Sequence, residues 1–180
     1  MVAPSFYTAD MVRALPDDGS RYETVHGELL VTPAPRKWHQ LVLGRLYSAI
    51  LVYLEANPVG HPFFSPADIS WGSDTLVQPD LFVVPLGDAR DQEWEGMRRL
   101  LLAVEVLSPS SIRADRFTKR RLYQEQQVPL YWVVDGESRT VEEWRPSASL
   151  PRLVRDEITW RPGGAAAPFT MYLGELFRAI

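Results

Sequence analysis

The sequence predicts a mixed α/β fold, in which a β-sheet is flanked by helices and preceded by an N-terminal β-hairpin. Two short strand-like runs flank the dipeptide His26-Gly27, which predicts the hairpin. From residue 37 onward the apolar periodicities follow the order helix, strand, strand, strand, helix, strand, which is typical of a sheet covered by helices. A chain of 180 residues fits one domain, and we expect that domain to span residues 1–180.

The N-terminal segment is expected to form a short helix and then the hairpin. A threonine N-cap favours a helix over residues 8–15, and a Pro-Asp-Asp-Gly turn ends it. Strands are expected at 22–25 and 28–32. The two residues between these strands form a connection of the length that closes tight hairpins.

The longest expected helix covers residues 37–56, where apolar side chains recur at helical spacing. A second long helix is expected at 111–127. Apolar runs bounded by turn residues mark the remaining strands, which we place at 62–64, 67–71, 77–84, 100–107, 130–135 and 140–145. The run at 100–107 is almost wholly apolar, which is typical of a central strand covered on both faces.

Composition and charge limit the classes of function. The chain has no cysteine, which excludes disulfides, thiolate metal sites and cysteine nucleophiles. Residues 1–10 lack the apolar part of a signal peptide, and no run of about 18 apolar residues occurs, so we expect a cytoplasmic protein without a membrane span. The net charge of −4 argues against a protein that coats nucleic acid through charge alone. It leaves room for an enzyme with a local basic strip.

Glu105 is the most informative single residue, because its carboxylate lies inside the apolar run Leu101–Leu107. Burying an unpaired ionised group costs several kcal/mol or more, so such a group normally has a partner, a metal or a proton. Either Glu105 belongs to a functional site, or it is a structural acid paired with an arginine or a backbone donor.

Asp80 repeats this anomaly in the preceding apolar run, where it follows Pro79. A Pro-Asp pair is also an ordinary signal for a turn or the start of a strand. Two acids on neighbouring strands, Asp80 and Glu105, could nevertheless share one hard cation. Mg²⁺ is usually held by one or two carboxylates together with water and substrate oxygens.

Lys119 adds a cation to these two acids. At about 100° per residue it shares its helix face with Ile112, Asp115 and Leu122, so we expect it to point toward the sheet. Its methylenes could instead pass along Leu122, or its ammonium could pair with Asp115. Two carboxylates and an inward lysine form the set that metal-assisted phosphodiester hydrolysis requires. We expect a Lys119→Met variant to fold and to cleave about 100- to 1000-fold more slowly.

Several motifs between about residues 20 and 145 occur together in this chain: Arg21-Tyr22-Glu23, Gly27-Glu28-Leu29, His39, Gln78-Pro79-Asp80, residues 104–110, Lys119, Tyr123 and residues 131–135. In combination they resemble the Uma-type family of putative restriction endonucleases, which is placed in the PD-(D/E)XK nuclease superfamily. The resemblance implies a restriction-endonuclease-like core with the order helix, three strands, helix, strand. That order agrees with the one expected from periodicity.

The resemblance also implies roles for individual residues. Asp80 and Glu105 would be the superfamily's two acids and metal ligands, and the carbonyl of Val106 is a candidate third ligand. The superfamily's usual lysine position holds Leu107 here, and the resemblance moves that role to Lys119 on the following helix.

Two further residues match the family. Glu28 could supply a metal ligand or a water-holding carboxylate, or it could be a surface strand residue. His39 could contact phosphate or carry a proton, or it could be a partly exposed structural histidine.

The function that we expect is an endonuclease that hydrolyses the phosphodiester bonds of DNA with Mg²⁺ or Mn²⁺. Arg113, Arg116 and Arg120 would contact backbone phosphates, and cleavage of duplexes would favour a homodimer by analogy alone. The acidic charge and the displaced lysine leave open a non-catalytic nucleic-acid-binding or interaction module that keeps the nuclease fold. A metal-free hydrolase with two carboxylates, acting for example on glycosidic bonds, is a further alternative. Activity in excess chelator would favour this last class.

Overall fold

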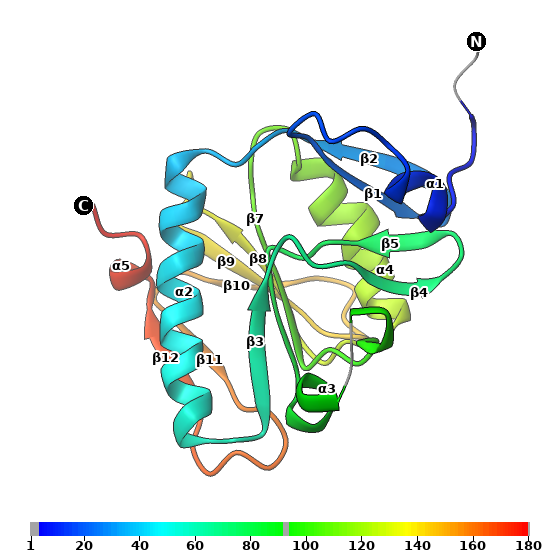
Figure 1. The fold of residues 1–180 in the computed structure, drawn as a ribbon. Coiled ribbons are helices and arrows are strands. Elements are labelled where there is room, and N and C mark those ends of the chain that lie inside the picture. The colour runs from blue at the N-terminus through cyan, green and yellow to red at the C-terminus, as the bar shows by residue number, and fades with distance from the viewer. Residues whose placement is uncertain (1–3, 92–93, 180) are drawn as a thin grey trace.

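The computed structural model describes residues 4–91 and 94–179 (Figure 1). Its first half contains α1 (Ala9–Arg13), β1 (Arg21–Val25), β2 (Glu28–Thr32), α2 (Lys37–Ala56), β3 (Gly60–Phe64), β4 (Ile69–Gly72), β5 (Thr75–Val77), β6 (Leu81–Pro85) and α3 (Leu86–Asp91). The second half contains the 3₁₀ turn η1 (Trp94–Gly96), β7 (Leu102–Val106), the π-helical turn η2 (Ala114–Lys119), α4 (Arg120–Glu125), β8 (Tyr131–Asp135), β9 (Thr140–Trp144), β10 (Arg152–Val154), β11 (Glu157–Trp160), β12 (Phe169–Tyr172) and α5 (Leu173–Leu176).

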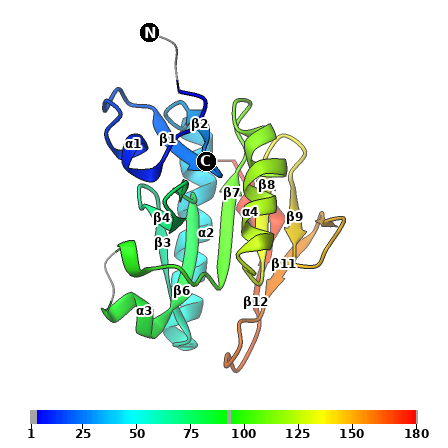
Figure 2. The same cartoon turned by 90° about the vertical axis from the view of Figure 1, so that its right-hand side faces the viewer.

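The main sheet has six strands in the order β10-β9-β8-β7-β6-β3. All neighbouring strands are antiparallel except β7 and β8, which are parallel, so the sheet is mixed. Every residue of β7 is buried, as expected for a central strand covered on both faces. Figures 1 and 2 show α2 and α4 on opposite sides of this sheet.

Side-chain alternation along the strands divides the core between these two faces. Val104 and Val106 of β7 pack in the cluster that contains the buried side of α2. Ala103 packs on the other face, in the cluster that contains Leu122 and Tyr123 of α4. Because Glu105 alternates with Val104 and Val106, its side chain lies on the α4 face.

A smaller antiparallel sheet has the order β2-β1-β5-β4 and includes the predicted hairpin. His26 and Gly27 both have positive φ, 51° and 81°, which is the conformation of a type I′ turn. This turn lies beside α4, since His26 Nε2 is 2.7 Å from Glu125 Oε2. The small sheet therefore packs against the helix that faces the main sheet.

The expected fold class, a mixed α/β sheet flanked by helices with an N-terminal hairpin, is confirmed. One predicted strand differs, because the run 77–84 is divided between two sheets. β5 ends at Val77 in the small sheet, and β6 begins at Leu81 in the main sheet. Pro79 lies between them and cannot donate a backbone hydrogen bond, so the ladder is interrupted there.

The predicted helix 111–127 also differs from a regular α-helix, because η2 forms its N-terminal part. No helix among residues 4–91 and 94–179 has both the length and the apolar character needed to cross a membrane.

Candidate active site

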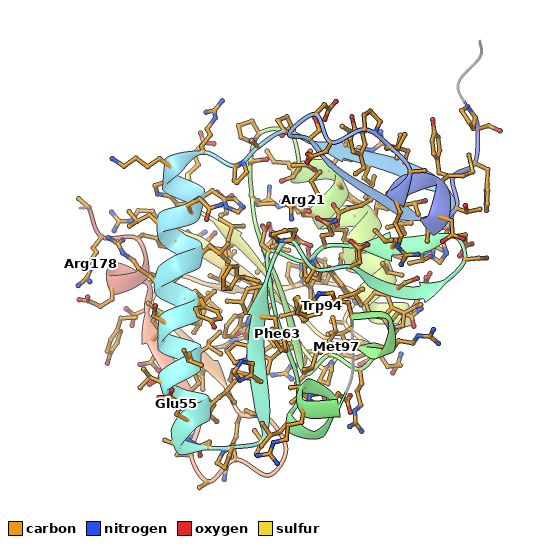
Figure 3. All side chains as sticks on the ribbon, viewed as in Figure 1. Arg21, Glu55, Phe63, Trp94, Met97 and Arg178 are labelled. Carbon is orange, nitrogen blue, oxygen red and sulfur yellow. The ribbon has the colours of Figure 1, made fainter. Side chains whose placement is uncertain are left out.

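A cavity of about 210 Å³ opens where the small sheet meets the α4 face of the main sheet. Its wall includes five of the residues singled out from sequence, namely His39, Asp80, Glu105, Val106 and Lys119. Residues 32–36, from the end of β2 onward, and residues 108–111 also line it. Arg21, labelled in Figure 3 between α2 and the small sheet, also lines the cavity.

Asp80 is held in place at both of its oxygens. Oδ2 accepts hydrogen bonds from the backbone N–H of Val106, at 2.8 Å, and lies 2.9 Å from Nε2 of His39. Oδ1 accepts a hydrogen bond of 2.8 Å from Nη1 of Arg21. Burial alone raises the pKa of Asp80, but the His39 hydrogen bond and the Arg21 charge hold that pKa well below its ordinary value. Asp80 is therefore a carboxylate at neutral pH.

Glu105 and Lys119 form a buried ion pair on the same face of the sheet. Oε1 of Glu105 accepts hydrogen bonds from Lys119 Nζ, at 3.0 Å, and from the Tyr123 hydroxyl, at 3.1 Å. Burial raises the pKa of Glu105 well above its ordinary value, and the charge of Lys119 opposes this rise. Burial would lower the pKa of Lys119, but the charges of Glu105 and Glu23 raise it above its ordinary value. Lys119 is therefore an ammonium.

The π-helical turn η2 brings two charged side chains inward. Asp115 and Lys119 are both buried, and Asp115 Oδ1 is 3.6 Å from Lys119 Nζ. The Tyr131 hydroxyl donates a 2.9 Å hydrogen bond to the Asp115 carbonyl within this turn. Single π-helical turns occur frequently at functional sites, because they change the direction in which side chains point.

Asp115 predicts a pH dependence of stability. Burial raises its pKa from the ordinary 3.8 to about 6, although the charge of Lys119 opposes the rise. A carboxyl whose folded-state pKa is raised favours folding only while it is protonated, so its contribution is present below about pH 3.8 and is lost as the pH rises through 6. We expect the stability of Asp115→Asn relative to the parent to increase by up to about 3 kcal/mol between pH 4 and 7. Urea titrations of both proteins across this range test it, and a difference that does not change with pH would contradict it.

Glu23 is a site residue that the sequence did not identify. Its side chain is fully buried on β1, where Oε1 accepts a 2.7 Å hydrogen bond from the Gln78 N–H and Oε2 lies 2.8 Å from Lys119 Nζ. One carboxylate thus connects the lysine of η2 to the segment that carries Asp80. The signal for it was present, because Arg21 and Glu23 are charged residues two apart in a strand and so point to the same face.

The structure corrects the prediction for Glu28. Its side chain is exposed at the turn end of β2 and borders a separate hollow with Arg113, Phe117 and Arg121. In the hairpin register Glu28 pairs with Val25, whereas Thr32 at the opposite end of β2 borders the cavity. The hairpin supplies Glu23 instead.

Two of the three arginines of the basic strip have partners within the fold. Arg116 forms ion pairs with Asp135, at 2.9 Å, and with Glu142, at 2.7 Å, so its charge is already used within the fold. Arg120 lies over the Trp144 ring, 4.8 Å from its centroid. Arg113 is exposed and has no ion pair within the described chain, and it borders the separate hollow rather than the cavity.

The cavity has an excess of negative charge. Four carboxylates, those of Glu23, Asp80, Glu105 and Asp115, interact with two permanent cations, Arg21 and Lys119. Arg36 also lines the cavity, so one negative charge remains if all four acids are ionised and His39 is neutral.

The donor set suits a hard divalent cation with few protein ligands. No group of three or more His, Asp or Glu side chains in the described residues has the arrangement of a metal centre. Asp80 and Glu105 line one cavity beside the backbone of Val106, and Mg²⁺ needs only one or two carboxylates when water and substrate supply the other ligands. The residues present therefore fit Mg²⁺ or Mn²⁺ better than a metal that needs an all-protein cage.

This architecture is that of a restriction-endonuclease-like α/β fold. A solved structure from Anabaena variabilis ATCC 29413, described as a putative nuclease belonging to DUF820, shares it with a TM-score of 0.79. That protein is 20% identical in sequence, and the match covers 95% of this chain and 97% of the other. The chain belongs to the Uma2 family, described as putative restriction endonuclease, whose model matches residues 9–163. No curated protein matches the sequence.

Proposed function

We propose that the chain is a metal-dependent endonuclease that hydrolyses DNA phosphodiester bonds in the cavity around Asp80, Glu105 and Lys119. Family membership supports a nuclease function at the level of class. The observation that carries the finer proposal is the meeting of the Asp80 carboxylate, the Glu105 carboxylate and a buried ammonium in one cavity. We assign these residues to the acids and the lysine of the PD-(D/E)XK arrangement.

Asp80, Glu105 and the Val106 carbonyl would hold Mg²⁺ or Mn²⁺. When bound, such an ion neutralises phosphate charge and makes a water molecule more acidic. Lys119 supplies a fixed positive charge where negative charge develops on the phosphoryl group. The Glu23 carboxylate lies 2.8 Å from Lys119 Nζ, so the ammonium is held in place at the end of the flexible lysine side chain.

Metal binding predicts a thermal shift. A ligand that binds only the folded chain stabilises it by about 2.7 kcal/mol at a hundred times its Kd, which for this size raises Tm by roughly 5–10 °C. We expect Mg²⁺ or Mn²⁺ to produce this shift in the parent and in the matched control Glu28→Gln, whose acid is exposed. Glu105→Gln should lose most of it. Equal shifts in Glu105→Gln and Glu28→Gln would place the ion elsewhere.

A cleavage assay tests the proposed function. Single- and double-stranded DNA and RNA substrates are incubated with Mg²⁺, with Mn²⁺ and with chelator. We expect DNA to be cleaved internally with either ion and left intact in chelator. Activity that survives chelator would contradict the proposal and favour the two-carboxylate hydrolase.

A non-catalytic binding module is the second candidate, and one observation favours it. Asp80 is paired with Arg21 and His39, and Glu105 is paired with Lys119, so both acids have partners in the absence of a metal. Tight binding of nucleic acid with no cleavage in either ion would support the module.

A further inference from the structure

Arg21 reaches the cavity with part of its guanidinium unused. Nη1 donates to the Gln78 carbonyl, at 2.7 Å, and to Asp80 Oδ1, at 2.8 Å. These bonds use both hydrogens of Nη1, and a guanidinium has five N–H donors. Nε and Nη2 donate to no group within the described residues, and the side chain remains 16% exposed on the cavity wall. The free edge formed by Nε and Nη2 therefore has three available hydrogens.

The other basic side chains that line the cavity differ from Arg21. Lys119 Nζ is enclosed by three carboxylates within 3.6 Å, so it would act on a further anion through its charge rather than through a planar pair of donors. His39 Nε2 is paired with Asp80. Arg36 is exposed at the rim. Nδ1 of His39 also lacks a partner, but it is buried. Among these four side chains, Arg21 alone is held in place and still has unpaired donors that are not fully buried.

A planar guanidinium edge matches two oxygens of a phosphate group, which an ammonium cannot contact in the same way. Asp80 and the Gln78 carbonyl fix the side chain in advance, so little side-chain entropy would be lost when an anion binds. We propose that Arg21 is a phosphate-binding residue, whose Nε–Nη2 edge holds one phosphate group of a nucleic-acid strand beside Asp80. This inference rests on the metal site of the proposed function, but not on cleavage of a nucleic acid.

The surrounding acids set a condition for this contact. Glu105, Asp115, Glu23 and Asp80 would repel an anion while their charge is uncompensated. Phosphate binding at Arg21 is therefore expected to require a divalent cation.

The test measures binding of inorganic phosphate by calorimetry with and without saturating Mg²⁺. We expect the parent to bind phosphate in Mg²⁺, and Arg21→Lys, which keeps the charge beside Asp80 but loses the planar edge, to bind at least tenfold more weakly. That change corresponds to about 1.4 kcal/mol. Arg13→Lys is the matched control, because Arg13 pairs with Asp10 and Asp68 outside the cavity and should leave binding unchanged.

Three results would overturn the inference: no phosphate binding by the parent in Mg²⁺, equal binding by Arg21→Lys, or a loss confined to Arg36→Lys at the rim. If Arg21→Lys fails to fold, a crystal of the parent soaked in phosphate and Mg²⁺ replaces the comparison. The inference then requires phosphate oxygens within hydrogen-bond distance of Nε and Nη2 of Arg21. Phosphate binding at Arg21 in a chain that cleaves no nucleic acid would keep this inference and remove the proposed function. If the parent cleaves nucleic acid and Arg21→Lys binds phosphate as tightly as the parent, the proposed function is kept and this inference is lost.

Discussion

Replacing Glu105 by glutamine is expected to abolish DNA cleavage while the chain stays folded. The amide keeps the size of the side chain and an oxygen that can accept from Lys119 and Tyr123, and it removes one of four crowded carboxylates. It also removes the charge that a divalent cation needs. A bound metal contributes several kcal/mol of transition-state stabilisation, and each 1.36 kcal/mol changes the rate tenfold. Single-turnover cleavage should therefore fall by about 1000-fold or more.

Glu28→Gln is the control for this substitution, because it makes the same chemical change at an exposed position outside the cavity. It should cleave like the parent. If a folded Glu105→Gln variant also cleaves at the parental rate, Glu105 is a structural acid and the proposed site is wrong.

Lys119→Met is expected to destabilise the fold strongly, and here the structure reverses the expectation from sequence. The sequence placed Lys119 on an apolar stripe, where a methionine could replace its stem. In the structure its ammonium is buried between Glu23 and Glu105, with Asp115 nearby. Removing one partner of a buried ion pair typically costs 3–5 kcal/mol, roughly 10 °C in Tm for a chain of this size. Thermal or urea unfolding at neutral pH measures the loss.

A second substitution separates loss of charge balance from loss of packing. In the Lys119→Met background, Glu23→Gln removes an unpaired carboxylate and keeps an oxygen to accept from the Gln78 N–H. We expect it to recover about 1–3 kcal/mol, although the same change alone should destabilise the parent. A double variant no more stable than Lys119→Met would indicate that the ammonium does not balance these acids.

The acids of the site could be predicted from sequence because they break a strong local pattern. Asp80 and Glu105 are charged residues in apolar runs, and burial of an ionised group requires a specific partner. Lys119 could be placed on the inner face because helical periodicity extends over several turns. The fold class followed from the same periodicities, together with the hairpin turn.

The ion pairs around these acids could not be predicted in the same way. Arg21 and Glu23 lie in a strand that also contains Tyr22 and Thr24, a composition equally typical of an exposed edge. Their roles depend on the packing of the small sheet against η2, which is a tertiary contact. Arg116 looked available in sequence, but its partners Asp135 and Glu142 are brought to it only by the main sheet.

Local backbone irregularities account for the remaining differences. The run 77–84 has the composition of one strand, but it is interrupted at Pro79. Its first part ends β5 of the small sheet, and its second part forms β6 of the main sheet. That break frees Asp80 from a regular ladder, so its carboxylate can accept the Val106 N–H. The π-helical turn at 114–119 has no signal in the apolar pattern, because one wide turn hardly changes the helical period.

Anomalous diffraction from a crystal soaked in Mn²⁺ tests most directly the claim that this cavity is a metal-dependent active site. We predict one ion whose ligands include carboxylate oxygens of both Asp80 and Glu105, at about 2.0–2.2 Å. Arg21 and Lys119 should remain at the cavity wall. A soaked crystal with no ion in the cavity, or with Mn²⁺ bound to only one of these acids, would contradict the account.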